Sequence, residues 1–388
     1  MVVQLDILLR IPLTKRGPGY TCARLAQGMS TPDFKVTIVT PRARGADIYP
    51  ARAAQALGRL ARISPYDWVR GDAVRQVEAV FESRFNLPTD GQHIAYMFPD
   101  SSIELLSKLK RRNVLIIREM INCHRGTAKR ILDQAYSRMG AEPHHAITAE
   151  SVEWERSALE FADYIFCPNR MVELSLIENG VPQSKLLESS YGWDPARFAG
   201  KRRMLESTDG MTVLFVGSVS VRKGVHLLLE HWARSGIKGR LVLAGEIEPT
   251  IAARCAHLLA RDDVVVLNYV KDVGSLYRSA DLFVFPTLEE GGPQVTYEAC
   301  GCGLPVITTP MGAGRIVNHN IEGFVLDPDD ADGWIGALRT LATDKELRRA
   351  MSAAALKSAL SFQWPAVARR RREAILQCLS LRVHNAAG

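Results

Sequence analysis

Short apolar runs alternate with stretches of helical periodicity along the whole chain. In the first half, runs with the length and composition of strands are Leu5–Leu9, Lys35–Thr40, Ile94–Met97, Val114–Arg118 and Tyr164–Pro168. In the second half they are Thr212–Val216, Arg240–Ala244, Val264–Leu267, Leu282–Phe285, Val306–Thr308 and Gly323–Leu326. Strands that alternate with helices are typical of parallel sheets covered on both faces. The pattern therefore predicts an α/β fold with doubly wound sheets.

A polar and charged segment, Phe198–Met211, separates the two sets of predicted strands. The chain has 388 residues, which is too long for one ordinary core and enough for two. We therefore predict two Rossmann-like domains, residues 1–200 and 201–364, that face a central cleft. A last helical stretch, residues 365–388, contains four consecutive arginines and is a candidate to pack back on the first domain.

Composition adds a charge bias to this picture. The net charge is +7, and residues 1–150 hold 22 Lys and Arg against 14 Asp and Glu. Such an excess fits an anionic partner or simply a solvated basic surface. Aromatic residues are not interleaved with the basic ones, so we expect no nucleic-acid partner. Peripheral contact with an anionic membrane fits better, because Ser101–Arg112 combines basic residues with an apolar helix side of Ile103, Leu105, Leu106 and Leu109.

The sequence lacks the usual patterns of membrane spans, signal peptides, disulfide frameworks and metal sites. No apolar run approaches the roughly 18–20 residues that span a bilayer, and the N-terminus lacks a signal-peptide pattern. We expect a cytoplasmic protein, with a peripheral position at the inner face of the membrane as a further option. The seven cysteines are scattered without a CxxC pair, and helix capping explains the acidic cluster in LDPDDADGW. We predict no disulfide framework and no metal site.

The most informative segment is FPTLEEGGPQVTYEACGCGLPVI, Phe285–Ile307. It predicts a strand, a glycine-rich turn and a helix that begins around Pro293, an arrangement that directs backbone N–H groups at an anion. The expected phosphate donors are the turn and the first helical residues, Gly291, Gly292, Gln294 and Val295. Two carboxylates, Glu290 and Glu298, accompany them, although carboxylates repel a phosphate. A ligand that is part diphosphate and part polyol, such as a nucleotide sugar, satisfies both features; an ordinary turn with solvated acids is the alternative.

Four motifs in sequence order resemble the retaining GT-B glycosyltransferases of family 4, also called glycosyl transferases group 1. They are FVGSVSVRKG (Phe215–Gly224), LVLAGE (Leu241–Glu246), Ser279–Ile307 around the paired glutamates, and EGFVLDPDD (Glu322–Asp330). The first half matches more loosely, through GPGY near Gly17, FADYIFCPN (Phe161–Asn169) and YGWDPARF (Tyr191–Phe198). The resemblance implies two domains of the GT-B type and a nucleotide-sugar donor held by the second domain.

The resemblance also implies roles for residues of the second half. Glu290 matches the glutamate that contacts donor-sugar hydroxyls, Glu298 the one that contacts the ribose, and Lys223 the lysine that neutralises the leaving diphosphate. The family usually has an arginine where this chain has Ser218. We hypothesise that Arg222 replaces that guanidinium; the alternative is that Arg222 is solvated and Lys223 acts alone. Pro293 is a further departure, because it stands where the family has glycine and removes one N–H donor.

Weaker candidates lie in the first half. Gly17 and Gly19 match a glycine-rich loop that faces the donor phosphate across the cleft, although a plain loop is an equal interpretation. His124 resembles the cleft histidine near the donor sugar and the acceptor, against the alternative of a structural histidine. Arg118 and Glu119, at the end of the preceding strand, are further candidates to reach the cleft.

The function implied by the resemblance is transfer of a sugar, with retention, from a UDP-, GDP- or ADP-sugar to an acceptor hydroxyl. We expect no cofactor, and a glycan or lipid-linked acceptor in envelope polysaccharide or glycolipid synthesis. The base is expected near Asn268–Val270. Alternatives are another GT-B enzyme, such as a nucleotide-sugar epimerase or a glycan phosphorylase, and a catalytically weak nucleotide-binding scaffold.

Overall fold

The computed structural model describes residues 2–43, 47–58, 66–86, 91–200 and 202–387. Its first sheet has seven parallel strands in the order β3-β2-β1-β4-β5-β6-β7. The strands are β1 (Val3–Leu9), β2 (Phe34–Thr40), β3 (Arg52–Gln55), β4 (Gln92–Phe98), β5 (Leu115–Glu119), β6 (Tyr164–Cys167) and β7 (Leu186–Glu188). Its interior strand β1 is buried along most of its length, as expected for a sheet covered by helices on both faces.

The second sheet has six parallel strands in the order β10-β9-β8-β11-β12-β13. They are β8 (Met211–Val216), β9 (Gly239–Ala244), β10 (Val264–Leu267), β11 (Leu282–Phe285), β12 (Val306–Thr308) and β13 (Gly323–Val325). In both sheets the strand order reverses once, between β1 and β4 and between β8 and β11. The predicted α/β fold with doubly wound sheets is therefore confirmed, and the reversal points mark where ligands bind in such sheets.

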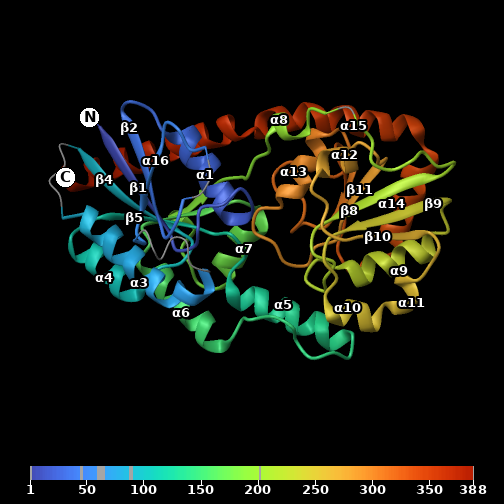
Figure 1. The fold of residues 1–388 in the computed structure, drawn as a ribbon, viewed down its shortest axis with the longest axis horizontal. Coiled ribbons are helices and arrows are strands. Elements are labelled where there is room, and N and C mark those ends of the chain that lie inside the picture. Colours follow the sequence, from blue (N-terminus) through green and yellow to red (C-terminus); the bar gives the residue numbers. More distant parts are fainter. Residues whose placement is uncertain (1, 44–46, 59–65, 87–90, 201, 388) are drawn as a thin grey trace.

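Helices cover both faces of each sheet (Figure 1). Those of the first half are α1 (Gly17–Met29), α3 (Tyr66–Arg84), α4 (Ile103–Arg111), α5 (Arg125–Arg138), α6 (Ala149–Phe161) and α7 (Arg170–Glu178). The second half has α8 (Pro195–Phe198), α9 (Val225–Ser235), α10 (Pro249–Arg254), α11 (Ala256–Leu259), α12 (Val273–Tyr277), α13 (Gln294–Gly301), α14 (Ala331–Thr343), α15 (Lys345–Ala359) and α16 (Trp364–Ala387). The acidic cluster before α14 acts as a cap, because the Asp330 carboxylate accepts a hydrogen bond from Gly333 N at 2.9 Å.

Two chain crossings connect the halves, and they pair with each other. The backbone N–H of Trp193, on the outward crossing, donates to Phe362 O. The Trp193 carbonyl oxygen accepts from the backbone N–H of Trp364, on the return crossing. Beyond this point α16 runs back along the first sheet and packs closely on α1 (Figure 1), where a Cβ on Gly28 would lie 2.6 Å from Ala368 Cβ. The two crossings therefore form one junction between the halves.

The apolar side of α4 faces inward and not outward. Leu105, Leu106 and Leu109 are buried in a core cluster with strands of the first sheet, and Lys108 pairs with Glu82 and Glu104. The prediction that the apolar side of this helix contacts a membrane is therefore wrong, because its hydrophobic residues are buried and stabilise the domain. Among the helices within the described ranges, none combines the length and apolar character that crossing a bilayer requires.

Candidate functional site

The loops after β8 and β11 meet at the reversal point of the second sheet. Gly224 adopts φ +67°, and a Cβ at this position would lie 2.0 Å from Pro286 O, so only glycine lets the two loops touch here. Beside this contact, Lys223 Nζ forms an ion pair with Glu290 Oε2. Glu290 also accepts a hydrogen bond from Gly291 N at 3.2 Å. The structure thus brings together the two residues for which the resemblance implies contacts with the diphosphate and the donor sugar.

The charge state of this pair follows from burial and neighbours. Burial alone would raise the pKa of Glu290, but Lys223 and Arg222 outweigh it and the pKa is lowered, so the carboxylate is ionised at neutral pH. Burial, together with the neighbouring Arg222, lowers the pKa of Lys223 in spite of Glu290. An additional anion next to Lys223 would favour its charged form, which is the property required of a group that meets a diphosphate.

Helix α13 begins one residue later than predicted, at Gln294, with Pro293 as its N-cap residue. Glu298 lies in its second turn, where it accepts from Gln294 Nε2 at 3.2 Å and from the Tyr277 hydroxyl at 3.4 Å. Burial raises the pKa of Glu298 to about 7, and Arg197, whose guanidinium lies 3.9 Å away, only partly opposes this. Glu298 is therefore a buried carboxyl that titrates near neutral pH.

Both glycines of the predicted phosphate turn are in contact with the first half of the chain. A Cβ on Gly291 would lie 2.0 Å from Ile121 O, and a Cβ on Gly292 would lie 2.2 Å from the Tyr191 ring. The N–H of Gln294 donates to Gly292 O at 2.8 Å, so this predicted donor has a partner within the turn. In this conformation the glycines let the two halves close on each other.

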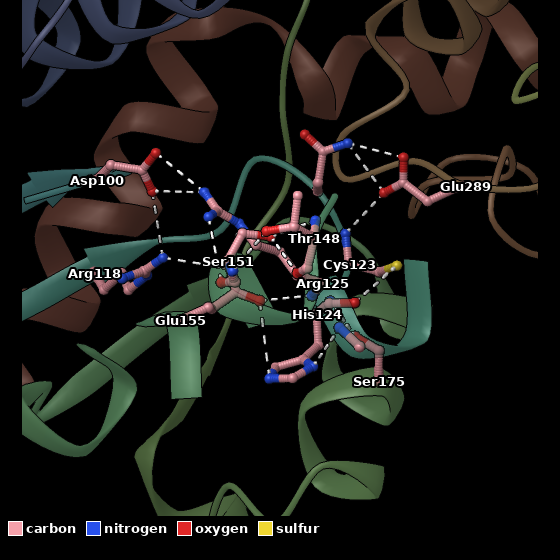
Figure 2. A network of polar contacts seen from close by, with 12 residues as sticks. Asp100, Arg118, Cys123, His124, Arg125, Thr148, Ser151, Glu155, Ser175 and Glu289 are labelled. Atoms are coloured by element: carbon pink, nitrogen blue, oxygen red, sulfur yellow. Dashed lines mark hydrogen bonds and ion pairs between the residues drawn. The ribbon is translucent and has the colours of Figure 1, made fainter. Parts of the chain in front are cut away.

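A carboxylate that we did not single out, Glu289, lies at the centre of this contact. It is 1% exposed and accepts hydrogen bonds from Asn122 Nδ2 at 3.0 and 2.9 Å and from Cys123 N at 3.1 Å. Figure 2 shows this carboxylate directed at the Cys123 backbone. Its Oε2, which accepts from Asn122, also pairs with the Arg222 guanidinium at 3.2 Å. The EEGG sequence signals two acids but does not tell which of them faces the neighbouring domain.

The predicted glycine loop of the first half lies opposite the predicted base segment. Helix α1 begins at Gly17, which has φ +57°, and a Cβ on Gly19 would lie 2.9 Å from Thr14 N. The guanidinium of Arg16 lies over the Tyr269 ring, 4.5 Å from its centroid. Tyr269 follows β10 closely, so the structure brings the loop before α1 next to the 268–270 segment.

His124 is not brought to the Lys223–Glu290 pair. It is the N-cap residue of α5, where its Nδ1 accepts from Gly126 N at 3.1 Å, and it is 2% exposed. Figure 2 shows its ring on the side of Glu155, whose Oε2 lies 3.8 Å from Nε2. Burial, with Arg118 and Arg125 nearby, lowers the pKa of His124 to about 4, so the ring is neutral. Asn122, two residues earlier, reaches the second domain instead.

A cavity of about 390 Å³ lies next to this contact, mainly in the first domain. Its polar lining includes Asp100, Arg118, Arg125, Glu155, and Arg222 with Glu289 from the second domain. Arg118 therefore reaches a cavity at the interface, whereas Glu119 turns into the core, where it pairs with Arg371. A larger cavity of about 690 Å³ lies between α5 and α9, but none of the predicted site residues lines it. The smaller cavity is therefore the one that adjoins the candidate site.

Within the described ranges, no group of three or more His, Cys, Asp or Glu side chains is arranged to hold a metal ion. The cationic groups at the site are instead protein side chains, Lys223 and Arg222, each paired with a neighbouring glutamate.

Comparison with known proteins identifies the second half. Residues 199–358 match the family model "Glycosyl transferases group 1". The match lies in the half that carries the paired glutamates and the lysine loop, and it agrees with the group 1 motifs. A D-inositol 3-phosphate glycosyltransferase of Thermobispora bispora is 32% identical over 203 residues, which cover 48% of this chain and 47% of the relative. The capsular polysaccharide biosynthesis glycosyltransferase CapM of Staphylococcus aureus is 29% identical over 147 residues, 36% of this chain and 39% of CapM. The matched segments thus span at most about half the length of these relatives.

Solved structures extend the comparison over both halves. Sucrose-phosphate synthase from Thermosynechococcus elongatus superposes with a TM-score of 0.72 at 17% identity, covering 98% of this chain and all of that one. HepE of Anabaena in complex with UDP-glucose gives a TM-score of 0.65 at 15% identity, covering 96% and 99%. At such identities the likeness establishes the fold, which is the GT-B arrangement that the group 1 motifs implied.

Proposed function

We propose that this chain is a retaining glycosyltransferase of family 4 that transfers a sugar from a nucleoside-diphosphate sugar to an acceptor hydroxyl. The observation that carries the proposal is the Lys223–Glu290 pair at the reversal point of a group 1 domain. In this structure the Lys223 ammonium and the Glu290 carboxylate pair with each other. When the donor binds, the ammonium can contact the diphosphate and the carboxylate can accept hydrogen bonds from sugar hydroxyls.

The leaving group determines what the site has to do. As the bond between the anomeric carbon and the diphosphate oxygen breaks, negative charge grows on that oxygen, and Lys223 and Arg222 stabilise it. Glu290, released from Lys223, accepts hydrogen bonds from donor-sugar hydroxyls, and Glu298 accepts from the ribose. As the resemblance implies, the acceptor attacks on the leaving-group side and a phosphate oxygen takes its proton, so no protein nucleophile is required.

The reaction is proposed to need no metal or cofactor, because the side chains of Lys223 and Arg222 can neutralise the charge of the leaving diphosphate. Arg222 and Lys223 are adjacent in sequence, and each pairs with one of the two adjacent glutamates Glu289 and Glu290. Chelation of divalent cations is expected to leave the rate unchanged; a strict requirement for Mg²⁺ or Mn²⁺ would contradict this part of the proposal.

The donor base is proposed to lie near the 268–270 segment, where Tyr269 and Arg16 already face each other across the cleft. The Anabaena HepE structure contains UDP-glucose, which makes UDP-sugars the first donors to test, followed by GDP- and ADP-sugars.

The acceptor is proposed to enter the cavity of about 390 Å³ beside Glu289. Its lining mixes carboxylates with guanidinium groups, which suits a polyhydroxylated molecule better than an apolar one. CapM is named for capsular polysaccharide synthesis, and this supports a glycan or lipid-linked acceptor of envelope polysaccharide or glycolipid synthesis. The basic first half is compatible with a cytoplasmic protein that contacts an anionic membrane, although α4 does not supply that contact.

The decisive experiment measures donor binding and turnover together. Thermal shifts with UDP, GDP, ADP and their sugars identify the base, and product analysis with the matching donor then follows transfer. Glu290→Gln is expected to abolish most turnover while the nucleoside diphosphate still binds. Full transfer by Glu290→Gln would sink the assignment, and donor isomerisation without acceptor or dependence on inorganic phosphate would favour the epimerase or phosphorylase alternatives.

A further inference from the structure

Glu289 differs from the paired glutamates in where its hydrogen bonds go. Glu290 pairs inside its own domain with Lys223, whereas Glu289 reaches Asn122 Nδ2 and Cys123 N, which belong to the other domain. The same carboxylate also holds Arg222 at 3.2 Å. One side chain therefore contacts both the opposite domain and a cation proposed to meet the diphosphate.

The geometry leaves little freedom for this carboxylate. Glu289 is 1% exposed, and Ile121, next to its partner Asn122, touches Gly291 so closely that no side chain fits there. The Arg222 side chain is 36% exposed, so its guanidinium is anchored on one side by Glu289 without being enclosed. Such a guanidinium can offer its remaining N–H groups to a further anion in a fixed orientation.

We propose that Glu289 is a positioning residue that couples closure of the two domains to the orientation of Arg222. The inference rests on the proposed function, because it assigns Arg222 to the donor diphosphate. When the domains close, Asn122 and Cys123 fix the Glu289 carboxylate, and the carboxylate in turn fixes the guanidinium. When they separate, Glu289 loses these donors and Arg222 loses its defined position.

This arrangement makes the cationic site complete only in the closed enzyme. A correctly placed guanidinium lowers the barrier because it does not have to reorient as charge develops. In the open enzyme, Arg222 would lack this orientation, so donor cleavage without closure is disfavoured. The coupling thus restricts donor cleavage, by an acceptor or by water, to the closed enzyme.

Donor hydrolysis in the absence of an acceptor tests the coupling without knowledge of the acceptor. The probe is UDP-glucose, or the GDP- or ADP-sugar that gives the larger thermal shift with the wild-type chain. For Glu289→Gln, we expect kcat to fall about 10- to 100-fold while the donor KM changes less than about threefold, since misplacement acts in the transition state. Asn122→Ala, which removes only the contact from the opposite domain, is expected to lower kcat in the same direction and by less.

A double-mutant cycle separates positioning from simple loss of structure. If Glu289 acts through Arg222, adding Glu289→Gln to Arg222→Ala changes kcat by less than about twofold. Asp329→Asn is the matched control, because it removes another contact between the halves, the exposed Arg138–Asp329 pair at 2.7 Å, and leaves kcat unchanged. Wild-type kcat in Glu289→Gln, or fully additive effects in the cycle, would overturn the inference while the proposed function stands. Absence of any nucleotide binding by the wild-type chain would overturn both.

Discussion

Two ion pairs of this chain each join a buried cation to a glutamate, but one is fully enclosed in the core and the other lies where the two domains meet. Arg371 of α16 pairs with Glu119 of β5, and the Arg371 guanidinium also donates to Ser189 Oγ at 3.2 Å and to Ser190 O at 3.1 Å. Lys223 pairs with Glu290 in the loops where the two domains meet. The first pair is fully enclosed, with side chains at most 2% exposed, whereas Glu290 keeps 14% of its side chain exposed.

The pKa directions express this difference. Burial alone would lower the pKa of Arg371, but Glu119 and Tyr96 raise it, so the cation is more than compensated by its neighbours. The pKa of Lys223 is lowered instead, because burial and the neighbouring Arg222 outweigh Glu290. A cation with surplus compensation stabilises a fold, and one with a deficit gains from a further anion. The comparison therefore supports a structural role for Arg371 and agrees with the ligand-binding role proposed for Lys223.

Removal of Lys223 is expected to give the largest effect on activity. Lys223→Met keeps much of the side-chain volume and removes the charge that is proposed to meet the diphosphate, so kcat should fall about 10³-fold. Initial rates with the cognate sugar nucleotide measure this. Lys238→Met, in which an exposed lysine of the same domain is replaced, should leave the rate unchanged. A loss of less than fivefold for Lys223→Met would remove the distinction between the two pairs.

Removal of Arg371 should affect stability and leave the chemistry intact. Arg371→Met leaves Glu119 buried without its charged partner, which typically costs about 3–5 kcal/mol of the free energy of unfolding. Urea denaturation should show this loss, whereas kcat per folded molecule stays within about threefold. Arg369→Met changes a neighbouring arginine whose pair with Glu373 is exposed, and should cost at most about 1 kcal/mol. Equal losses in both variants would contradict the structural role of Arg371.

Glu298 provides a third buried charge with a distinct pH signature. Its pKa is raised from 4.5 to about 7 in the folded chain, so the folded state holds a proton that the unfolded state has lost between these values. Stability contributed by Glu298 is therefore present below pH 4.5 and is lost as the pH rises towards 7, by about 1–3 kcal/mol. Glu298→Gln should abolish this decline and be more stable than wild type above pH 7. Parallel urea midpoints from pH 4.5 to 8 for the two proteins would contradict the raised pKa.

The fold was largely predictable because its central strands are apolar runs between helices. Every predicted run forms a strand, whereas β3 and β7 were missed. Both are short edge strands, and none of their residues is fully buried, so they lack the continuous apolar pattern that buried parallel strands require. Hydrophobic pattern alone predicts such edges poorly.

The candidate site was predictable on one side of the cleft only. Lys223 and Glu290 are 67 positions apart, but each follows a strand within a recognisable motif, and the two strands, β8 and β11, are neighbours in the same sheet. The contact between Asn122 and Glu289 joins residues 167 positions apart, and it depends on how two domains close. The prediction that Ser101–Arg112 contacts a membrane was wrong for a related reason. Periodicity reveals an apolar side of a helix but not what that side packs against, and here it packs in the core.

His124 gives the smallest expected effect and the clearest contrast between a structural and a catalytic role. His124→Asn keeps a favourable N-cap for α5, so kcat should stay within about threefold, and His124→Ala should cost about 1 kcal/mol of stability. Burial lowers the pKa of His124 to about 4, hence its neutral ring contributes stability above pH 6.5 that is lost as the pH falls towards 4. His124→Asn should reduce this acid sensitivity only in part, since burial also lowers the pKa values of His226 and His231 to about 4. A 100-fold loss of kcat in His124→Asn at unchanged stability would instead restore the cleft role that the sequence implied, and would mean that the ring turns towards the donor when substrate binds.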